Sequence, residues 1–132
     1  MTLVDSNVLL DVLSDGQVWG DWSQAELEQV AANGPLVIND VIYAEISTRY
    51  PSADTVDSIL RDLGVDLVAM PRAALFLAGK AYLRYRTAGG TRTGVLSDFF
   101  IGAHAAAENL PLLTRDVRRY RSYFPTISLI AP

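Results

Sequence analysis

The sequence has no cysteine, a single histidine, a single lysine and no long apolar run. The lack of cysteine excludes disulfide bonds and thiolate metal sites, and it suits a reducing cytoplasm, where we expect the protein to reside. No apolar stretch approaches the roughly 20 residues that a membrane-spanning helix needs, so we expect no membrane partner. The first residues lack the basic and apolar regions of a signal peptide. Glycine-rich phosphate-binding motifs of the Walker and GxGxxG kinds are also absent, which disfavours those nucleotide-binding folds.

The composition of the 132 residues is typical of a globular domain, with 50% hydrophobic and 20% charged residues. We therefore expect a single domain over residues 1–132. The net charge of −4 conceals a difference between the two halves of the chain. Residues 1–66 carry 12 acidic side chains and two arginines, whereas residues 67–132 carry nine basic side chains and three acidic ones. A basic half suits an anionic substrate, although solvated helical faces would explain the same charges.

Short apolar segments alternate with longer helical patterns along the chain. We expect strands at residues 2–4, 36–38, 66–70, 112–114 and 127–130. Helices are expected at 6–13, 23–33, 40–50, 52–64, 71–88, 97–108 and 116–120, with Ser23 and either Asn39 or Asp40 as caps and a loop at 89–96. This alternation predicts an α/β fold of three layers, α/β/α, around a central and mostly parallel sheet.

Four acidic side chains stand next to or inside apolar segments, where an unpaired carboxylate is uncommon. They are Asp5, Glu45, Asp98 and Asp116. In parallel α/β sheets, ligands bind beyond the carboxyl ends of the strands. Asp5 and Asp116 follow expected strands and Asp98 begins an expected helix, so we expect these three carboxylates to meet at one edge of the sheet.

Each of these acids also has an ordinary structural explanation. Asp98 and Asp116 could cap the helices that follow them, and Asp5 could bind the backbone amides of its own turn. Glu45 could form an ion pair with Arg49, which lies one helical turn further along the chain.

Taken together, the four carboxylates require a positive charge. Two carboxylates about 4 Å apart repel each other by roughly 4 kcal/mol at an effective dielectric constant of about 20. A hard divalent cation reverses the sign of this interaction, and Mg²⁺ and Mn²⁺ prefer oxygen ligands. Such an ion polarises phosphate groups and helps to deprotonate water. The pattern therefore predicts metal-dependent phosphodiester chemistry in which a metal-activated water attacks.

The order of the acidic motifs resembles that of PIN-domain ribonucleases. The motifs are the segments Val4–Leu10, Ala44–Ile46, Ser97–Ala105 and Leu113–Asp116. The chain length and layout are similar to those of the VapC-type toxins of bacterial toxin–antitoxin pairs, and the resemblance covers essentially the whole chain.

This resemblance implies that Asp5, Glu45, Asp98 and Asp116 form an acidic pocket that holds Mg²⁺ or Mn²⁺. It also implies that Thr114 borders the pocket and that Asn7 helps to organise it. The partners that it implies are an RNA substrate, a cognate antitoxin protein, DNA contacted only through the antitoxin, and a second copy of the chain in a homodimer.

Arginines gather in the second half of the chain, close to the expected edge of the sheet. Those that could contact RNA phosphates are Arg84, Arg86, Arg92, Arg115, Arg118 and Arg119. The lone histidine, His104, lies on an apolar helical stripe, and we expect it to be packed and hydrogen-bonded. It also lacks a nucleophile with which to form a hydrolase triad.

The sequence thus favours a Mg²⁺- or Mn²⁺-dependent endoribonuclease that cleaves RNA phosphodiester bonds, with the toxin role implied by the resemblance. Two other classes stay open. The first is an interaction module without catalytic activity, in which the acids are caps and ion pairs. The second is an aspartate-based phosphatase or phosphoacceptor domain, which is disfavoured because Asn7 stands where one such family places a second aspartate, and because the only lysine, Lys80, lies in the middle of a helix.

Overall fold

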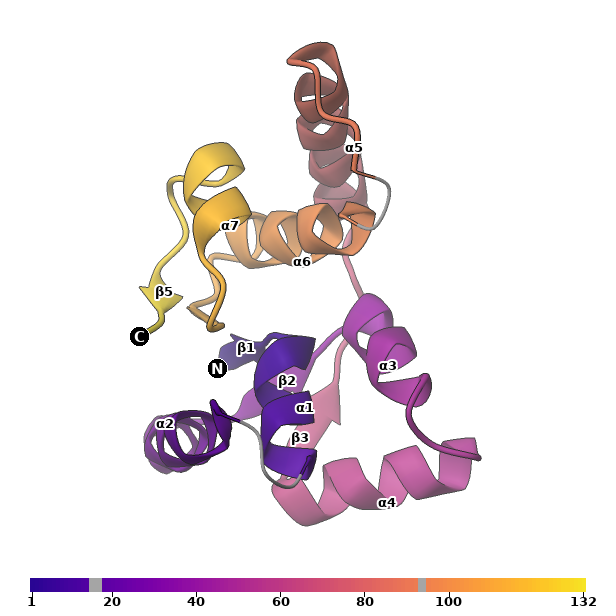
Figure 1. Ribbon diagram of the computed structural model, residues 1–132, viewed down its shortest axis with the longest axis vertical. Coiled ribbons are helices and arrows are strands. Elements are labelled where there is room, and N and C mark those ends of the chain that lie inside the picture. The colour runs from indigo at the N-terminus through magenta and orange to yellow at the C-terminus, as the bar shows by residue number, and fades with distance from the viewer. Residues whose placement is uncertain (15–17, 93–94) are drawn as a thin grey trace.

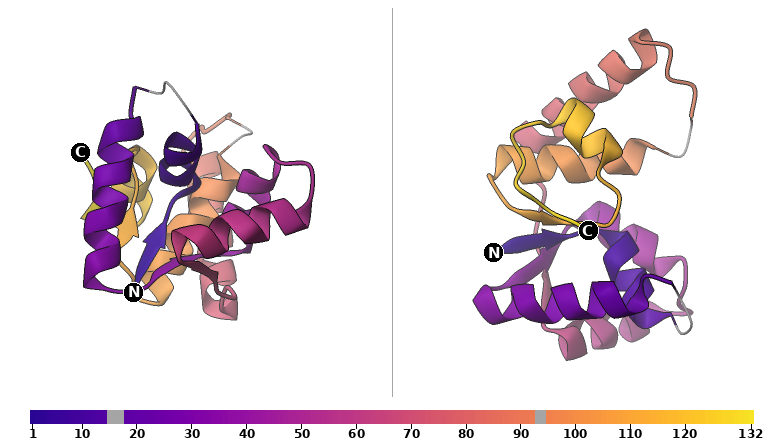
Figure 2. Two further views of the ribbon diagram at one scale, coloured as in Figure 1. Left: turned by 90° about the horizontal axis from the view of Figure 1, so that it is seen from below. Right: turned by 60° about the vertical axis from the view of Figure 1, so that its left-hand side comes forward.

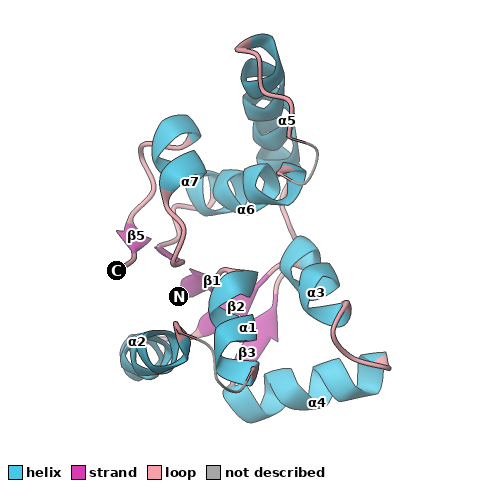
Figure 3. Ribbon diagram, viewed as in Figure 1, coloured by secondary structure: helices cyan, strands magenta, loops and turns pink. Residues whose placement is uncertain are grey.

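The computed structural model describes residues 1–14, 18–92 and 95–132. Its centre is a sheet of five strands in the order β3-β2-β1-β4-β5, in which all four neighbouring pairs are parallel (Figures 1 and 3). The strands are β1 (Thr2–Val4), β2 (Leu36–Ile38), β3 (Val65–Leu67), β4 (Leu112–Leu113) and β5 (Leu129–Ile130).

Helices cover both faces of this sheet, which confirms the expected three-layer α/β/α fold with a parallel sheet. They are α1 (Ser6–Leu13), α2 (Gly20–Asn33), α3 (Asp40–Ser47), α4 (Ala53–Leu63), α5 (Arg72–Thr87), α6 (Leu96–Ala107) and α7 (Arg118–Tyr123). Helices α1, α2 and α4 lie on one side of the sheet, and α6 and α7 lie on the other (Figures 1 and 2). Helix α5 packs against α6 and projects beyond the sheet.

One predicted cap and one pair of predicted helix ends are confirmed, and a second predicted cap is wrong. The Asn39 side chain accepts a hydrogen bond from the Ile42 amide at 3.0 Å and begins α3. Helix α4 runs between the predicted Ser52 and Gly64, and Gly64 ends it with a φ of 70°, in the left-handed region that favours glycine. Ser23, however, does not begin α2, because this helix starts three residues earlier at Gly20.

Several other predicted boundaries are also corrected. The third strand ends at Leu67 rather than at residue 70, and the fourth and fifth strands are shorter than predicted. Helix α6 begins at Leu96, so Asp98 lies inside its first turn. Helix α7 spans Arg118–Tyr123 rather than 116–120, which places Asp116 in the loop before it. The predicted loop at 89–96 includes residues 93–94, which lie outside the described residues.

The register of the sheet brings the ends of β1 and β4 to the same level. Leu3 pairs with Leu112 and Val4 pairs with Leu113. The next residues along these two strands are therefore Asp5 and Thr114, side by side at the carboxyl edge of the sheet. The backbone bond from the Asp5 amide to the Leu113 carbonyl, 2.9 Å long, continues the pairing up to this edge.

A close contact between α6 and the end of α7 positions the last element of the site. A Cβ atom on Gly102 of α6 would collide with the Phe124 ring and would lie 3.1 Å from the Tyr120 ring. Glycine at this position therefore lets α7 approach α6 closely. The Tyr120 side chain, which is 2% exposed, can then lie beside the carboxyl edge of the sheet. Among the described residues, no helix combines the length and the apolar character needed to cross a membrane.

Candidate active site

Asp5 lies at the centre of the acidic edge and is only 4% exposed. Its Oδ2 accepts hydrogen bonds from the Tyr120 hydroxyl at 2.7 Å, from the Thr114 hydroxyl at 2.9 Å and from the Asn7 amide at 3.4 Å. All of these donors are neutral. Burial raises the pKa of Asp5, and the hydrogen bonds from Tyr120 and Thr114 oppose that shift without reversing it. Asp5 is therefore a buried carboxylate without a positive partner among the described residues.

Ser6 connects Asp5 to Glu45, which comes from α3 on another part of the chain. The Ser6 hydroxyl lies 3.0 Å from Glu45 Oε1 and 3.4 Å from Asp5 Oδ1. Burial is the main cause that raises the pKa of Glu45, and the charge on Asp5 adds to it. The Glu45–Arg49 ion pair, the ordinary explanation considered for Glu45, is not among the ion pairs of the described residues.

Asp98 and Asp116 complete the acidic edge from the other side. Together with Asp5 they line a small cavity of about 40 Å³, which we call the acidic cavity. The described residues that line it are Asp5, Asn7, Asp98, Asp116, Arg119 and Tyr120. Burial, followed by the charge on Asp5, raises the pKa of Asp98 to about 6, although Arg119 acts in the opposite direction. Asp98 also senses the charges of Glu45 and Asp116, so it lies within electrostatic range of the three other predicted acids.

Helix capping accounts for these acids only in part. Asp5 makes no capping hydrogen bond to α1, although the backbone amides of Ser6 and Asn7, in its own turn, act to lower its pKa. Helix α6 has Val95 as its N-cap residue and receives no side-chain cap from Asp98. Asp116 alone makes a weak local contact, in which Oδ1 accepts from the Arg118 amide at 3.4 Å.

The two supporting residues predicted beside the acids, Thr114 and Asn7, both contact Asp5. Thr114 is fully buried and donates to Asp5, while Asn7 bridges Asp5 and Thr114 through its amide nitrogen. The Asn7 side-chain oxygen accepts from the Arg115 amide at 3.4 Å, which connects the start of α1 to the segment after β4.

Two residues that touch Asp5 were not predicted from the sequence. Tyr120 makes the shortest contact, at 2.7 Å, and Ser6 links two of the acids. The one signal for Tyr120 is its position as the single apolar residue within Arg118–Arg121, a short segment that closely follows Asp116. Ser6 had no signal of its own, because its role depends on how α3 packs against α1.

The six predicted arginines fall into three groups. Arg92, Arg118 and Arg119 line a second cavity of about 230 Å³ together with Tyr85 and Ser122, and we call it the basic cavity. Arg119 also lines the acidic cavity, so the two cavities adjoin. Arg115 instead binds the buried Asp11 through Nε at 2.7 Å. Arg84 and Arg86 are exposed on the last turn of α5 and line neither cavity.

The carboxylates suit a divalent cation in chemistry, although their oxygens do not converge on a single point in this conformation. Among the described residues, no three acidic or histidine side chains are arranged closely enough to hold a metal ion as they stand. Asp98 and Asp116 keep side-chain exposures of 31% and 47%, so both carboxylates are partly open to solvent. An all-oxygen donor set in which the charge on Asp5 raises the pKa of Glu45 and Asp98 fits Mg²⁺ or Mn²⁺.

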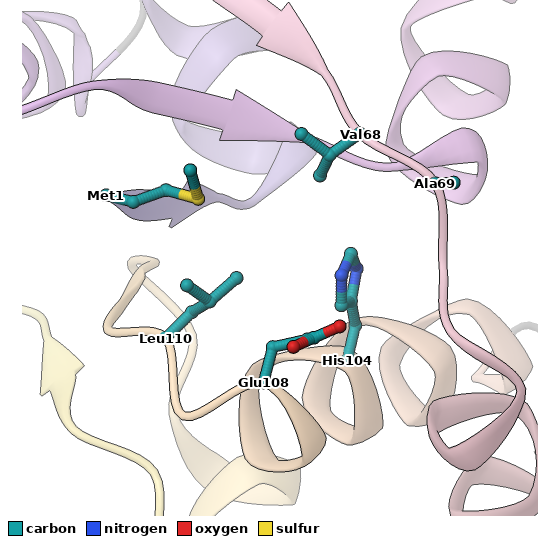
Figure 4. Close-up of a pocket in the computed structure, with 6 residues that line it drawn as sticks. All are labelled: Met1, Val68, Ala69, His104, Glu108 and Leu110. Atoms are coloured by element: carbon teal, nitrogen blue, oxygen red, sulfur yellow. The ribbon is translucent and has the colours of Figure 1, made fainter.

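A larger cavity, of about 360 Å³, lies between α6 and the sheet and is separate from the acidic edge. Figure 4 shows His104 and Glu108 entering it from α6, opposite Val68. His104 is 1% exposed, and its Nδ1 lies 3.1 Å from the Asn39 amide nitrogen, which donates to it. Burial lowers the pKa of His104. The expectation of a packed, hydrogen-bonded histidine is confirmed.

Comparison with solved structures gives the same fold over nearly the full length of the chain. A chain of VapBC2 from Rickettsia felis, bound to a DNA fragment from its promoter, is 18% identical with a TM-score of 0.74, and the alignment covers 99% of this chain and 98% of that one. A chain of VapBC-1 from nontypeable Haemophilus influenzae is 16% identical with a TM-score of 0.72, with 98% and 96% covered. A chain of a toxin–antitoxin complex from Klebsiella pneumoniae is 18% identical with a TM-score of 0.69, with 98% and 96% covered.

At these identities the structural likeness establishes the fold alone. No match is found among curated protein sequences. The family is established by the sequence itself, because the PIN domain matches residues 2–124. The resemblance noted in the sequence is thereby confirmed at the level of the family, and the chain belongs to the PIN-domain family.

Proposed function

We propose that this protein is a Mg²⁺- or Mn²⁺-dependent endoribonuclease whose active site is the acidic cavity. The observation that carries the proposal is the environment of Asp5. This buried carboxylate has only neutral hydrogen-bond donors, and it shares a cavity with two further carboxylates. Burial disfavours the charged form of such a group, and a cation close to it would stabilise that form.

Asp5, Glu45, Asp98 and Asp116 would hold the metal ion in this proposal. When bound, the ion would supply a Lewis acid for the scissile phosphate and lower the pKa of a water molecule. The protein groups around it have separate tasks. Tyr120 and Thr114 orient the Asp5 carboxylate, and Ser6 keeps Glu45 directed towards Asp5.

The basic cavity is the proposed path of the RNA backbone. Arg92, Arg118 and Arg119 present guanidinium groups next to the acidic cavity, and guanidinium groups bind phosphate oxygens well. Contacts of Arg84 and Arg86 with RNA stay predictions, since these side chains line neither cavity. The bond from Arg115 to Asp11 favours a structural role for that arginine.

The structural neighbours support a partner protein for this chain. Three of them are components of VapBC or toxin–antitoxin complexes, and one was crystallised with promoter DNA. We propose that this chain is likewise the toxin of such a pair, that it forms a homodimer, and that an antitoxin mediates any contact with DNA. Co-purification of a small protein encoded beside this chain tests that role, and a protein that stays free of any such partner would contradict it.

The direct test of the enzyme proposal is incubation of the purified protein with defined single-stranded RNAs. Cleavage is expected with Mn²⁺ or Mg²⁺, and it is expected to stop with EDTA. The Asp5→Asn and Asp98→Asn variants, purified in parallel, control for contaminating nucleases. RNA cleavage at the wild-type rate by both variants would contradict the assignment. An interaction module, in contrast, would bind no Mn²⁺ at all.

A further inference from the structure

Arg119 has an unusual position, because it lines both the acidic and the basic cavity. Its Nη1 lies 2.9 Å from Asp98 Oδ2, and this is the one hydrogen bond that its side chain makes with the described residues. Arg119 is also the one basic residue among the six that line the acidic cavity. Its guanidinium therefore neutralises part of the charge that a divalent cation would otherwise neutralise.

The Arg119–Asp98 pair is weak enough to be exchanged. The two side chains are 19% and 31% exposed, so water screens their attraction. Ion pairs exposed to solvent contribute only about 0–1 kcal/mol. A doubly charged ion that contacts several carboxylates at once gains more than this single contact provides. An ion that enters the acidic cavity can therefore take Asp98 away from Arg119 at a small cost.

The basic cavity, which adjoins the acidic cavity, can accommodate the released guanidinium. Arg118 and Ser122 stand on the same short helix as Arg119 and face that cavity, and Arg92 reaches it from the loop after α5. These groups carry positive charge and hydrogen-bond donors but no carboxylate. A phosphate group of RNA would fit there, and a third guanidinium would strengthen its binding.

We infer that Arg119 is a tethered counter-ion which the divalent cation displaces from Asp98, and which then binds the RNA backbone in the basic cavity. This inference rests on the proposed function and adds a regulatory step to it. Loading of the metal and binding of RNA become coupled, because each favours the conformation in which Arg119 has left Asp98. By thermodynamic reciprocity, RNA must then tighten the binding of the metal by the same factor.

The test is calorimetric titration of Mn²⁺ into the metal-stripped protein and its Arg119→Gln variant. Removing the competing guanidinium is expected to tighten Mn²⁺ binding by about two- to fivefold, in line with an ion pair of this exposure. The same variant is expected to bind RNA more weakly, measured with a 2′-O-methyl phosphorothioate oligonucleotide in the presence of Mn²⁺. A purely structural role for Arg119 would weaken both kinds of binding or neither.

Two variants serve as controls. Arg92→Gln removes a guanidinium that lines only the basic cavity, so it should weaken oligonucleotide binding and leave the Mn²⁺ affinity unchanged. Arg119→Lys keeps a positive charge beside Asp98 and should bind Mn²⁺ with nearly the wild-type affinity. Thermal melting of each variant confirms that the fold is intact.

The coupling itself is measurable on the wild-type protein, without any variant. The oligonucleotide should tighten Mn²⁺ binding by about fivefold, at the lower end of ordinary coupling between sites. Equal Mn²⁺ affinity with and without the oligonucleotide would overturn the inference, as would weaker Mn²⁺ binding by Arg119→Gln. In both cases the proposed metal site would stand. Complete absence of Mn²⁺ binding by the wild type would instead overturn the proposed function and this inference together.

Discussion

Two buried aspartates, one just before α1 and one within it, have opposite surroundings. Asp5 and Asp11 are each 4% exposed. Asp11 accepts a hydrogen bond from Ser23 at 2.9 Å and forms an ion pair with Arg115 at 2.7 Å, so its charge is matched by the fold itself. Asp5 receives only neutral donors and stands near three more carboxylates. The two aspartates are therefore equally buried, and they differ in whether a protein cation matches their charge.

The largest effect that separates the two aspartates should be on RNA cleavage. Asp5→Asn removes the central carboxylate, and we expect cleavage of a fluorescent RNA to fall by more than the roughly 10–100-fold that loss of an outer metal partner causes. The same change removes an unmatched buried charge, so the melting temperature without metal should stay equal or rise. A lower melting temperature together with retained cleavage would show that Asp5 is a structural acid like Asp11.

The second effect should appear in stability alone. Asp11→Ala leaves Arg115 and Ser23 without their shared partner, and breaking a buried ion pair costs about 3 kcal/mol. For a domain of this size the melting temperature should drop by about 10 °C, measured by circular dichroism. Mn²⁺ affinity at a temperature where the variant is folded should match that of the wild type. A loss of Mn²⁺ affinity equal to that of Asp5→Asn would erase the distinction between the two sites.

The sequence singled out the four acids but not their partners. Asp5, Glu45, Asp98 and Asp116 each adjoin an apolar segment, and the parallel alternation of strands and helices placed three of them at one edge. Asp11 was missed, because its partners lie 12 and 104 residues away and only the tertiary fold brings them to it.

Similar limits explain the errors at the element boundaries. Ser23 has the chemistry of a cap, but its hydroxyl binds Asp11, and α2 begins earlier. Tyr120 was missed because its contact with Asp5 depends on Gly102, where a Cβ atom would collide with the end of α7. The start of α2 and the Tyr120 contact therefore depend on packing between distant segments, which local sequence propensity does not predict.

A third and smaller effect concerns the dependence of stability on pH without metal. Burial and the charge on Asp5 raise the pKa of Asp98 from 3.8 to about 6, so between these values the folded state binds more protons than the unfolded state. Stability from this group should fall as the pH rises from about 4 to above 6. Urea unfolding of the wild type and Asp98→Asn should diverge over this range. The comparison cancels the contribution of His104, whose lowered pKa acts in the opposite direction.

Parallel pH dependence in wild type and Asp98→Asn would mean that the pKa of Asp98 is not raised in the folded protein. Asp11→Ala provides the contrast. In the Asp11→Ala background, proteins with and without Asp98 should still differ in the pH dependence of their stability. Added Mn²⁺ should remove the fall in stability towards high pH, since the ion stabilises the ionised carboxylates.

The smallest effect should come from the edge of the basic cavity. Arg118 is 82% exposed, and its contact with Asp116 is long, at 3.7 Å. Arg118→Gln should therefore leave stability within about 0.5 kcal/mol of the wild type. If this guanidinium contacts one RNA phosphate, the slope of log affinity against log salt should become less steep by about 1. An unchanged slope would remove Arg118 from the RNA path.

Mn²⁺ calorimetry on matched variants shows whether a cation supplies the positive charge that Asp5 lacks. The metal-stripped wild type and Asp11→Ala are expected to bind Mn²⁺ with the same affinity, while Asp5→Asn should bind it far more weakly or not at all. Equal Mn²⁺ binding by Asp5→Asn and the wild type would contradict this expectation.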